Sequence, residues 1–240
     1  MTEPTPSDWT DRLESQQDYY RARAGEYDEW FERKGRYDRG PEANAAWFRE
    51  AEVVRGELRL LQPFGDVLEL AAGTGIWSRE LLRGADALTV VDGAEEMLAL
   101  HALNVPDPRV RRIQADLFRW SPDRQYDFVA FGFWLSHVPK ELFPGFFALV
   151  ARCLRPGGRF FFVDSLYSQA STARDHELAP VESQFQRRRL NDGREFEIVK
   201  RFPSPAALEA DLRELGWDVD IRATGTYFIY GWGTRRGSDG

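Results

Sequence analysis

Two closely spaced glycines after an apolar run are the first feature of this 240-residue sequence that could do chemistry. Positions 67–78 read Val-Leu-Glu-Leu-Ala-Ala-Gly-Thr-Gly-Ile-Trp-Ser, which places Gly73 and Gly75 in a loop behind a predicted strand. Glycine lets the backbone turn tightly and lets a ligand approach it closely. Asp92 ends the next apolar run, and a carboxylate there can accept both hydroxyls of a ribose. Together these residues predict a nucleoside site, whereas the glycines alone would also fit a plain strand–helix turn.

Two neighbouring residues narrow the class of nucleotide. Ser78 stands where the dinucleotide fingerprint has its third glycine, and Glu69 lies inside the strand just before the loop. A pyrophosphate is poorly matched to a nearby carboxylate, whereas a cationic amino-acid group is well matched. A nicotinamide dehydrogenase is therefore disfavoured.

Basic residues gather around one predicted hairpin of an otherwise acidic chain: Arg187, Arg188, Arg189, Arg194, Lys200 and Arg201. Strand alternation puts Arg188 on the face opposite Arg187 and Arg189. A forked guanidinium suits a carboxylate or a phosphonate. The alternative is a solvated edge strand whose charges block aggregation, partly neutralised by nearby glutamates.

Two further titratable residues follow predicted strands. His137 is the one candidate base if the acceptor is a hydroxyl or an amine, but it could equally be an orienting hydrogen-bond donor beside Pro139. Asp164 could bind a substrate amine, or it could simply end its strand.

Composition excludes several classes of protein. Acidic residues outnumber basic ones, 39 against 32, which argues against a nucleic-acid binder. We find no apolar run near the ~20 residues of a membrane helix, and the acidic, polar start does not resemble a signal peptide. A single cysteine, Cys153, and three scattered histidines leave no disulfide and no metal-ligand spacing. A cytoplasmic, metal-independent protein is the expectation, and the net charge does not exclude a small-molecule anionic substrate held in a local basic pocket.

Strand and helix signals alternate through the first two thirds of the chain, which predicts an α/β fold with a mostly parallel sheet. The predicted strands are 66–71, 87–91, 109–115, 126–131 and 159–163. The predicted helices are 15–33, 41–61, 76–83, 94–103, 141–154 and 205–215.

The pattern changes after Asp164. A polar loop over 165–183 precedes a hairpin of 184–190 with 194–200, and 217–222 with 226–230 reads as a terminal antiparallel pair. The ends, 1–8 and beyond about Trp232, read as frayed tails. We therefore expect one domain over 1–240, divided into an N-terminal helical cap (9–62), a core (63–164), a substrate-side insertion (165–203) and a terminal helix with strands (204–232).

Five segments in order resemble class I S-adenosylmethionine (SAM)-dependent methyltransferases. They are the glycine loop at 67–78, Val-Asp-Gly-Ala-Glu-Glu-Met-Leu at 91–98, Gln-Ala-Asp-Leu-Phe at 114–118, the strand at 126–132 and Leu-Arg-Pro-Gly-Gly at 154–158. The resemblance implies a Rossmann-like seven-stranded sheet with an antiparallel terminal strand, and SAM as the cofactor.

The resemblance also implies positions for the cofactor. Gly73 and Gly75 would lie close to the methionine part of SAM, and Asp92 would accept hydrogen bonds from the ribose hydroxyls. Asp116 would bind the adenine amino group, with the Leu117 backbone nearby. Met97 would pack on the adenine, or it could be ordinary helix core. The remaining candidates for this cavity are Tyr20, Glu69, Ala71, Trp77, Gly93, Phe118 and Phe133.

A closer resemblance joins segments 15–28, 133–139 and 190–200 to actinobacterial phosphonate O-methyltransferases. By that resemblance Tyr27, Arg188 and Lys200 would bind the phosphonate. Ligands of open α/β sheets bind beyond the carboxyl ends of the strands, so Trp134, His137 and Asp164 are further substrate candidates. An ionised acceptor needs no base, so Arg188 and Lys200, with His137, complete the catalytic candidates.

Other interpretations stay open. An amine or hydroxyl methyltransferase would need a carboxylate-lined pocket or a base, and a non-catalytic SAM-binding protein would show no turnover. The N-terminal aromatic stripe with Tyr19, Tyr20, Arg23 and Tyr27 could be a lid, plain helix core or the interface of a homodimer.

Overall fold

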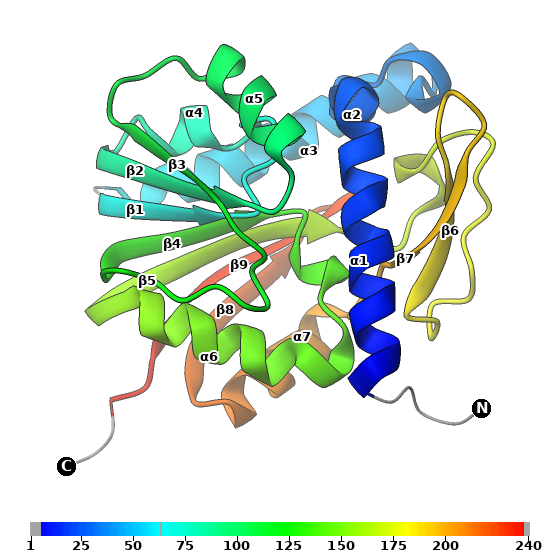
Figure 1. Cartoon of the computed structure of the whole chain (residues 1–240). Helices are drawn as coiled ribbons and strands as arrows, with labels where there is room; N and C mark the ends of the chain where they lie inside the picture. Colours follow the sequence, from blue (N-terminus) through cyan, green and yellow to red (C-terminus); the bar gives the residue numbers. More distant parts are fainter. Residues whose placement is uncertain (1–5, 63, 238–240) are drawn as a thin grey trace.

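The computed structural model describes residues 6–62 and 64–237, and its centre is a seven-stranded sheet (Figure 1). The strand order is β3-β2-β1-β4-β5-β9-β8, with β9 antiparallel to both of its neighbours. The strands are β1 Gly65–Leu70, β2 Ala85–Asp92, β3 Val110–Gln114, β4 Tyr126–Gly132, β5 Leu154–Ser165, β8 Trp217–Ala223 and β9 Phe228–Arg235. The predicted fold class, a mostly parallel sheet with an antiparallel terminal strand, is confirmed.

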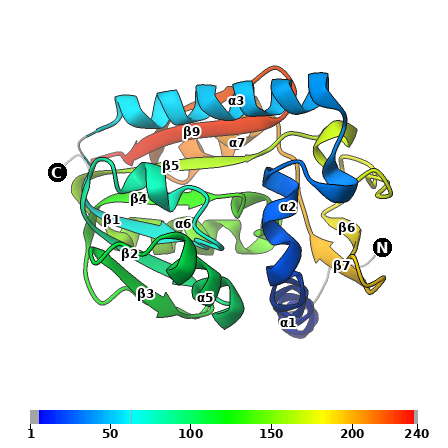
Figure 2. The ribbon, with the colours of Figure 1, turned by 90° about the horizontal axis from the view of Figure 1, so that it is seen from above.

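Helices cover both faces of this sheet (Figure 2). The α-helices are α1 Pro6–Arg23, α2 Tyr27–Phe31, α3 Pro41–Leu60, α4 Ser78–Leu81, α5 Glu95–Asn104, α6 Phe143–Cys153 and α7 Pro205–Glu214. The 3-10 turns are η1 Ala24–Glu26, η2 Gly35–Tyr37, η3 Leu135–His137, η4 Lys140–Leu142 and η5 Gln169–Ser171. Within the described residues, none of these helices has both the length and the apolar character needed to cross a bilayer.

Each central strand is buried on both faces, which explains the nearly continuous apolar runs in the sequence. In β1, Val67 packs in the layer of α3 and α4, while Leu68 and Leu70 pack in the layer of α6 and α7. Alternation places Glu69 on the same face as Val67. A carboxylate therefore enters an apolar layer directly before the glycine loop.

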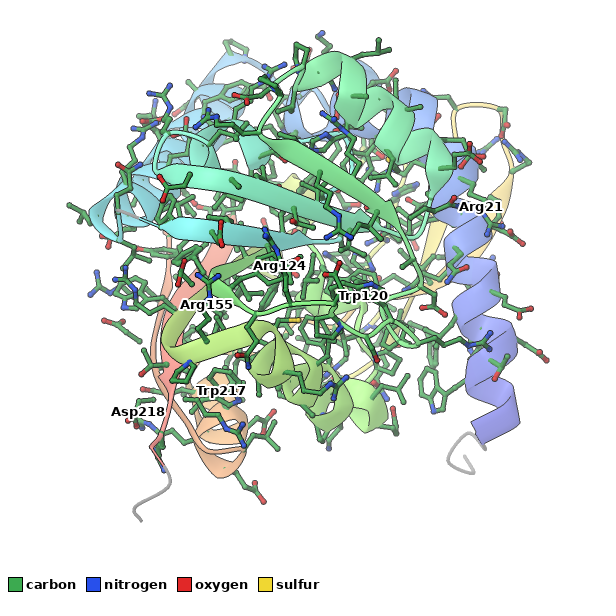
Figure 3. The ribbon with its side chains drawn as sticks, turned by 60° about the vertical axis from the view of Figure 1, so that its left-hand side comes forward. Arg21, Trp120, Arg124, Arg155, Trp217 and Asp218 are labelled. Atoms are coloured by element: carbon green, nitrogen blue, oxygen red, sulfur yellow. The ribbon has the colours of Figure 1, made fainter. Side chains whose placement is uncertain are left out.

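The carboxyl ends of the parallel strands face α1 and a separate two-stranded hairpin, β6 Phe185–Arg189 and β7 Glu195–Val199 (Figure 1). The side chains of Tyr19 and Ile198 join α1 to β7. At the other end of the strands, far from α1, Arg155 forms ion pairs with Asp66 and Asp127 (Figure 3). The site must therefore form between the strand ends, α1 and the hairpin.

Some predicted boundaries are wrong. The helix predicted over 15–33 is two helices, because the η1 turn around the poor helix former Gly25 separates α1 from α2. Helix α1 already begins at Pro6, inside the predicted tail, where proline suits the first helical turn; residues 1–5 lie outside the described residues. Helix α4 is only four residues long, and β9 continues past Trp232 to Arg235 because it pairs with both β5 and β8.

Candidate functional site

Unusual backbone conformations mark the ends of two adjacent strands. Ala71 follows β1 with φ 53° and Phe133 follows β4 with φ 56°, and both are non-glycine residues in the left-handed region. Such residues each cost of the order of 1–2 kcal/mol and collect at functional sites. Gly73, two residues after Ala71, has φ 53° and supplies the same conformation without a steric penalty.

Asp92, at the end of β2, holds the glycine loop. Its Oδ2 accepts the backbone N–H of Gly73 at 2.8 Å, and its Oδ1 accepts that of Ala94 at 2.9 Å. Burial raises the pKa of Asp92, and the backbone N–H groups of Ala94 and Gly73 partly oppose this shift. The sequence prediction that Gly73 and Asp92 act together is consistent with this geometry.

A cavity opens above these strand ends, and we call it the glycine-loop cavity. It holds about 700 Å³ of space, part of it open to solvent. Ten of the predicted cofactor residues line it: Tyr20, Ala71, Gly73, Asp92, Gly93, Met97, Asp116, Leu117, Phe118 and Phe133. Tyr27 and Trp134, predicted as substrate residues, line it as well, and α1 adds Leu13, Gln16 and Gln17, which the sequence analysis missed.

Three predicted cofactor residues do not line this cavity. Gly75 is required by packing, since a Cβ there would lie 2.6 Å from the Val105 side chain. Trp77 lies in the apolar layer, against the backbone of Gly132, where a Cβ would approach its ring to 2.5 Å. Glu69 is buried beneath the loop, 2% exposed.

Glu69 instead ends a buried polar chain. It accepts a hydrogen bond from Ser78 Oγ, which contacts His101 Nε2 at 2.9 Å, and Arg112 Nε donates to His101 Nδ1 at 3.1 Å. Burial raises the pKa of Glu69 to about 8 and lowers that of His101 to about 4. Ser78, which replaces the third glycine of the dinucleotide pattern, thus has a polar partner on each side.

A second cavity adjoins the first, and we call it the basic cavity. Tyr20, Tyr27 and Phe133 line both, so these three side chains form the boundary between them. The basic cavity holds about 560 Å³, part of it open to solvent. Its predicted substrate residues are Tyr27, His137, Arg188 and Lys200.

Arg188 contributes a buried guanidinium to the basic cavity. The residue is 8% exposed, and its Nη1 donates to the Arg187 carbonyl at 3.0 Å. Burial lowers the pKa of Arg188. No carboxylate of residues 6–62 and 64–237 lies within 4 Å of this guanidinium. Arg187 is exposed on the opposite face of β6, as predicted from strand alternation, and pairs with Glu195 at 3.8 Å.

Lys200 is buried too, but it has an acidic partner. Its Nζ donates to Ser136 Oγ at 2.7 Å and to Asp164 Oδ1 at 3.1 Å. Burial lowers the pKa of Lys200, and Asp164 partly offsets this shift. Asp164 also accepts from the Ser136 and Ser165 backbone N–H groups, and it does not line the basic cavity. The expectation that Asp164 meets a substrate amine therefore does not fit the structure, because Lys200 neutralises this carboxylate from the cavity side.

His137 has a protein partner on each ring nitrogen. Nδ1 lies 2.6 Å from the Val199 carbonyl, so it carries the proton, and Nε2 accepts from the Tyr20 hydroxyl at 2.8 Å. Burial, with Lys200 nearby, holds the pKa of His137 well below its ordinary value. This geometry favours an orienting role for a neutral ring over the role of a free base.

The basic cavity has further titratable residues that were not among the predicted site residues: Tyr19, Arg23, Tyr37 and His176. Tyr19 and Arg23 are one helical turn apart, a spacing that places them on one face of α1. Tyr37 lies in the short η2 turn and His176 in an irregular segment, and neither has a periodic signal. The described residues hold no group of three histidine, cysteine, aspartate or glutamate side chains able to bind a metal.

Comparison with known proteins places this geometry in a family. A family model described as a methyltransferase domain matches residues 67–158. The structure titled "DhpI-SAH complex structure" is 39% identical in sequence, with a TM-score of 0.76, over 94% of this chain and 98% of that chain. The "DhpI-SAM-HEP complex" has the same identity and TM-score over 93% and 97% of the two chains.

A more distant structure shares the fold alone. It is a S-adenosylmethionine-dependent methyltransferase from Clostridium acetobutylicum, 16% identical, with a TM-score of 0.61 over 89% of this chain and 99% of that chain. No curated protein sequence matches. Identity and coverage against DhpI, together with the domain model, show that this chain belongs to the SAM-dependent methyltransferases.

Proposed function

We propose that the protein transfers the methyl group of SAM to an oxygen of a small anionic acceptor, a phosphonate or a carboxylate. The observation that carries this proposal is the buried Arg188, which has no carboxylate partner among the described residues and lies in a cavity that adjoins the glycine-loop cavity. A buried charge without a partner is costly unless a ligand of opposite charge supplies one. The resemblance to phosphonate O-methyltransferases and the DhpI complex with SAM and HEP point in the same direction.

The residues of the glycine-loop cavity fit SAM. The backbone at Gly73 is open on the cavity side, where a Cβ would come no closer than 3.7 Å to the Tyr27 ring. Asp92 is placed to accept ribose hydroxyls, and Met97, Leu117 and Phe118 form apolar walls suited to an adenine. When bound, SAM supplies an electrophilic methyl group.

The chain's own residues would then hold and align the acceptor. An ionised phosphonate or carboxylate oxygen is already a nucleophile, so no base is required. Arg188 and Lys200 would offset its charge, and Tyr27, on the boundary of both cavities, would orient it. Alignment of two reactants can supply roughly 7–11 kcal/mol of barrier reduction.

Two other acceptor classes are less well supported. An amine acceptor would need a carboxylate in the basic cavity, yet no aspartate or glutamate is among its lining residues in the described chain. A neutral hydroxyl would need a base, and both ring nitrogens of His137 already have protein partners.

The test is methyl transfer from labelled SAM to alkyl phosphonates, carboxylates, phenols and amines. We expect label in the phosphonates or carboxylates, with Arg188→Ala and Lys200→Ala reducing transfer by about 10- to 100-fold. Arg187→Ala is the matched control, because the neighbouring guanidinium lies on the solvent face of the same strand. Transfer to amines or phenols that Arg188→Ala does not impair would overturn the proposal, and SAM binding without turnover would favour a non-catalytic protein.

A further inference from the structure

The basic cavity contains a second unpaired cation, Arg23, at the last residue of α1. Its guanidinium lies over the Tyr27 ring at 4.9 Å and over the Tyr19 ring at 5.6 Å, and Nη2 reaches the Tyr37 hydroxyl at only 3.5 Å. The Nε atom is buried and has no hydrogen-bond partner. None of the carboxylates of the described chain lies within 4 Å of this guanidinium.

A neighbouring arginine on the same helix has a different environment. Arg21, two residues earlier on α1, is exposed and pairs with Asp18 at 2.8 Å (Figure 3). A favourable effect on the helix dipole needs only a cation near the helix C-terminus, and Arg21 already provides one. The position of Arg23 between two aromatic rings and facing a cavity is therefore not explained by helix capping.

The charges around the basic cavity sum to an excess of two. Arg23, Arg188 and Lys200 are its cationic lining residues, and Asp164 behind Lys200 neutralises one of them. The other titratable lining residues are His137, His176 and the tyrosines at 19, 20, 27 and 37. Burial lowers the pKa of both histidines and raises that of Tyr19, Tyr20 and Tyr27, so these two histidines and three tyrosines are neutral near pH 7.

We propose that Arg23 is a specificity-determining residue and that, with Arg188, it selects an acceptor carrying two negative charges. This inference rests on the proposed function and deepens it: of the two acceptor classes, it favours the phosphonate dianion over a monocarboxylate. The aromatic clamp leaves Arg23 Nε without a hydrogen-bond partner and gives Nη2 only the long contact with Tyr37, so a ligand oxygen is the partner that satisfies this guanidinium.

The same charge count bears on product release. As an acceptor oxygen forms its bond to the methyl carbon, the carbon–sulfur bond breaks and its electron pair stays on the sulfur, which becomes a neutral thioether. The acceptor changes from a dianion to a monoanionic methyl ester. The product then offsets only one of the two unpaired guanidinium charges. A site built for a dianion therefore binds its product more weakly than its substrate.

The experiment compares two tetrahedral anions of equal size. Ethylphosphonate and ethanesulfonate are titrated into the protein loaded with S-adenosylhomocysteine (SAH), the demethylated form of SAM. The pH is kept above the second pKa of the phosphonate, where only the phosphonate is doubly charged. We expect the phosphonate to bind at least about tenfold more tightly than the sulfonate. Arg23→Gln should weaken phosphonate binding by about 10- to 100-fold and sulfonate binding much less, so that the preference is lost.

Two further variants separate charge from structure. Arg23→Lys keeps the charge and should keep the preference, whereas Arg21→Gln should change neither affinity. Equal binding of the two anions by the wild-type protein would overturn the inference, as would equal weakening of both by Arg23→Gln or loss of the preference in Arg23→Lys. If phosphonates are methylated under these outcomes, the proposed function stands without the inference; if no anion binds or is methylated, both are wrong.

Discussion

The two adjoining cavities are built in opposite ways. The glycine-loop cavity is lined largely by residues that follow consecutive parallel strands, and its charged groups are the carboxylates Asp92 and Asp116. The basic cavity is assembled from α1, the loop around His176 and the β6–β7 hairpin, and its charged lining residues are all cationic. The first arrangement comes with the sheet, whereas the second depends on segments that pack against one another at a distance in sequence. A substitution that disrupts one cavity should therefore leave ligand binding in the other unchanged.

Loss of Lys200 should have the largest effect, and it should fall on the basic cavity. Lys200→Met leaves Asp164 buried without its cation, which typically costs about 3–5 kcal/mol of unfolding free energy. Adding Asp164→Asn removes the stranded charge and should recover most of that stability, measured by urea unfolding. Methyl transfer to an anionic acceptor should stay low in both variants, while SAH affinity stays near the wild-type value.

The double variant decides what Lys200 does. If methyl transfer returns together with stability, Lys200 acts only through Asp164 and takes no part in binding the acceptor. If SAH affinity falls along with stability, the two cavities are not independent.

Asp92 should show the converse effect in the glycine-loop cavity. Asp92→Ala removes the acceptor of the Gly73 and Ala94 backbone N–H groups as well as the proposed partner of the ribose. Charge-assisted hydrogen bonds of this kind are worth about 1.5–3 kcal/mol each, so we expect SAH affinity to fall by about 100-fold in calorimetry. Asp86→Ala, at the exposed start of the same strand, should have no effect. A loss of only a few-fold would mean that Asp92 serves the loop alone.

The same contrast between the two cavities explains which parts of the fold and the site could be predicted from the sequence. The alternation of strands and helices predicted the mostly parallel sheet, and the Gly73 loop and Asp92 were predictable because the carboxyl ends of parallel strands lie on the same side of a sheet. Gly75 was assigned to the cofactor because a glycine required by packing looks the same in sequence as one that admits a ligand. Trp77 follows in the same loop, but its ring packs against Gly132 in the apolar layer. Glu69 was misplaced because its partner, Ser78, belongs to the buried layer.

The basic cavity could be predicted only in part. Strand alternation separated Arg188 from its neighbours, and the resemblance assigned it to the substrate, but nothing in the sequence pairs Asp164 with Lys200, which lie 36 positions apart. Arg23 fell on a helix predicted to be continuous, where its face could not be assigned beyond an aromatic stripe. Long-range packing, not local propensity, decides these contacts.

Acidification should cause local unfolding around the basic cavity before it affects the central sheet. Burial lowers the pKa of His176 to about 4 and that of His137 well below its ordinary value. The stability that these histidines contribute is therefore complete above pH 6.5 and is lost as the pH falls toward 4. For each proton taken up when this region opens, the protection of its backbone amides against hydrogen exchange falls by about tenfold per pH unit.

The sheet side has opposing contributions. The contribution of His101 to folding stability is lost over the same range, because its pKa is about 4. The contribution of Glu69 grows as the pH falls from 8 toward 4.5, because its pKa is about 8. Hydrogen exchange corrected for its intrinsic rate should thus show 185–199 losing protection between pH 7 and 5 before β1 and β4 do. Simultaneous loss in both regions would contradict this difference.

The boundary between the cavities should show the smallest effect and the most informative one. Tyr20→Phe removes the hydroxyl that His137 Nε2 accepts and leaves that buried nitrogen unpaired, at a cost of about 1–3 kcal/mol. Because Tyr20 lines both cavities, we expect a rate of methyl transfer lowered by about tenfold, with little change in the affinity for either SAH or the acceptor. In a double-mutant cycle with His137→Gln, the two changes should be strongly non-additive, since each breaks the same bond. Simple additivity would show that Tyr20 and His137 act separately, and a selective loss of SAH affinity would assign Tyr20 to the glycine-loop cavity alone.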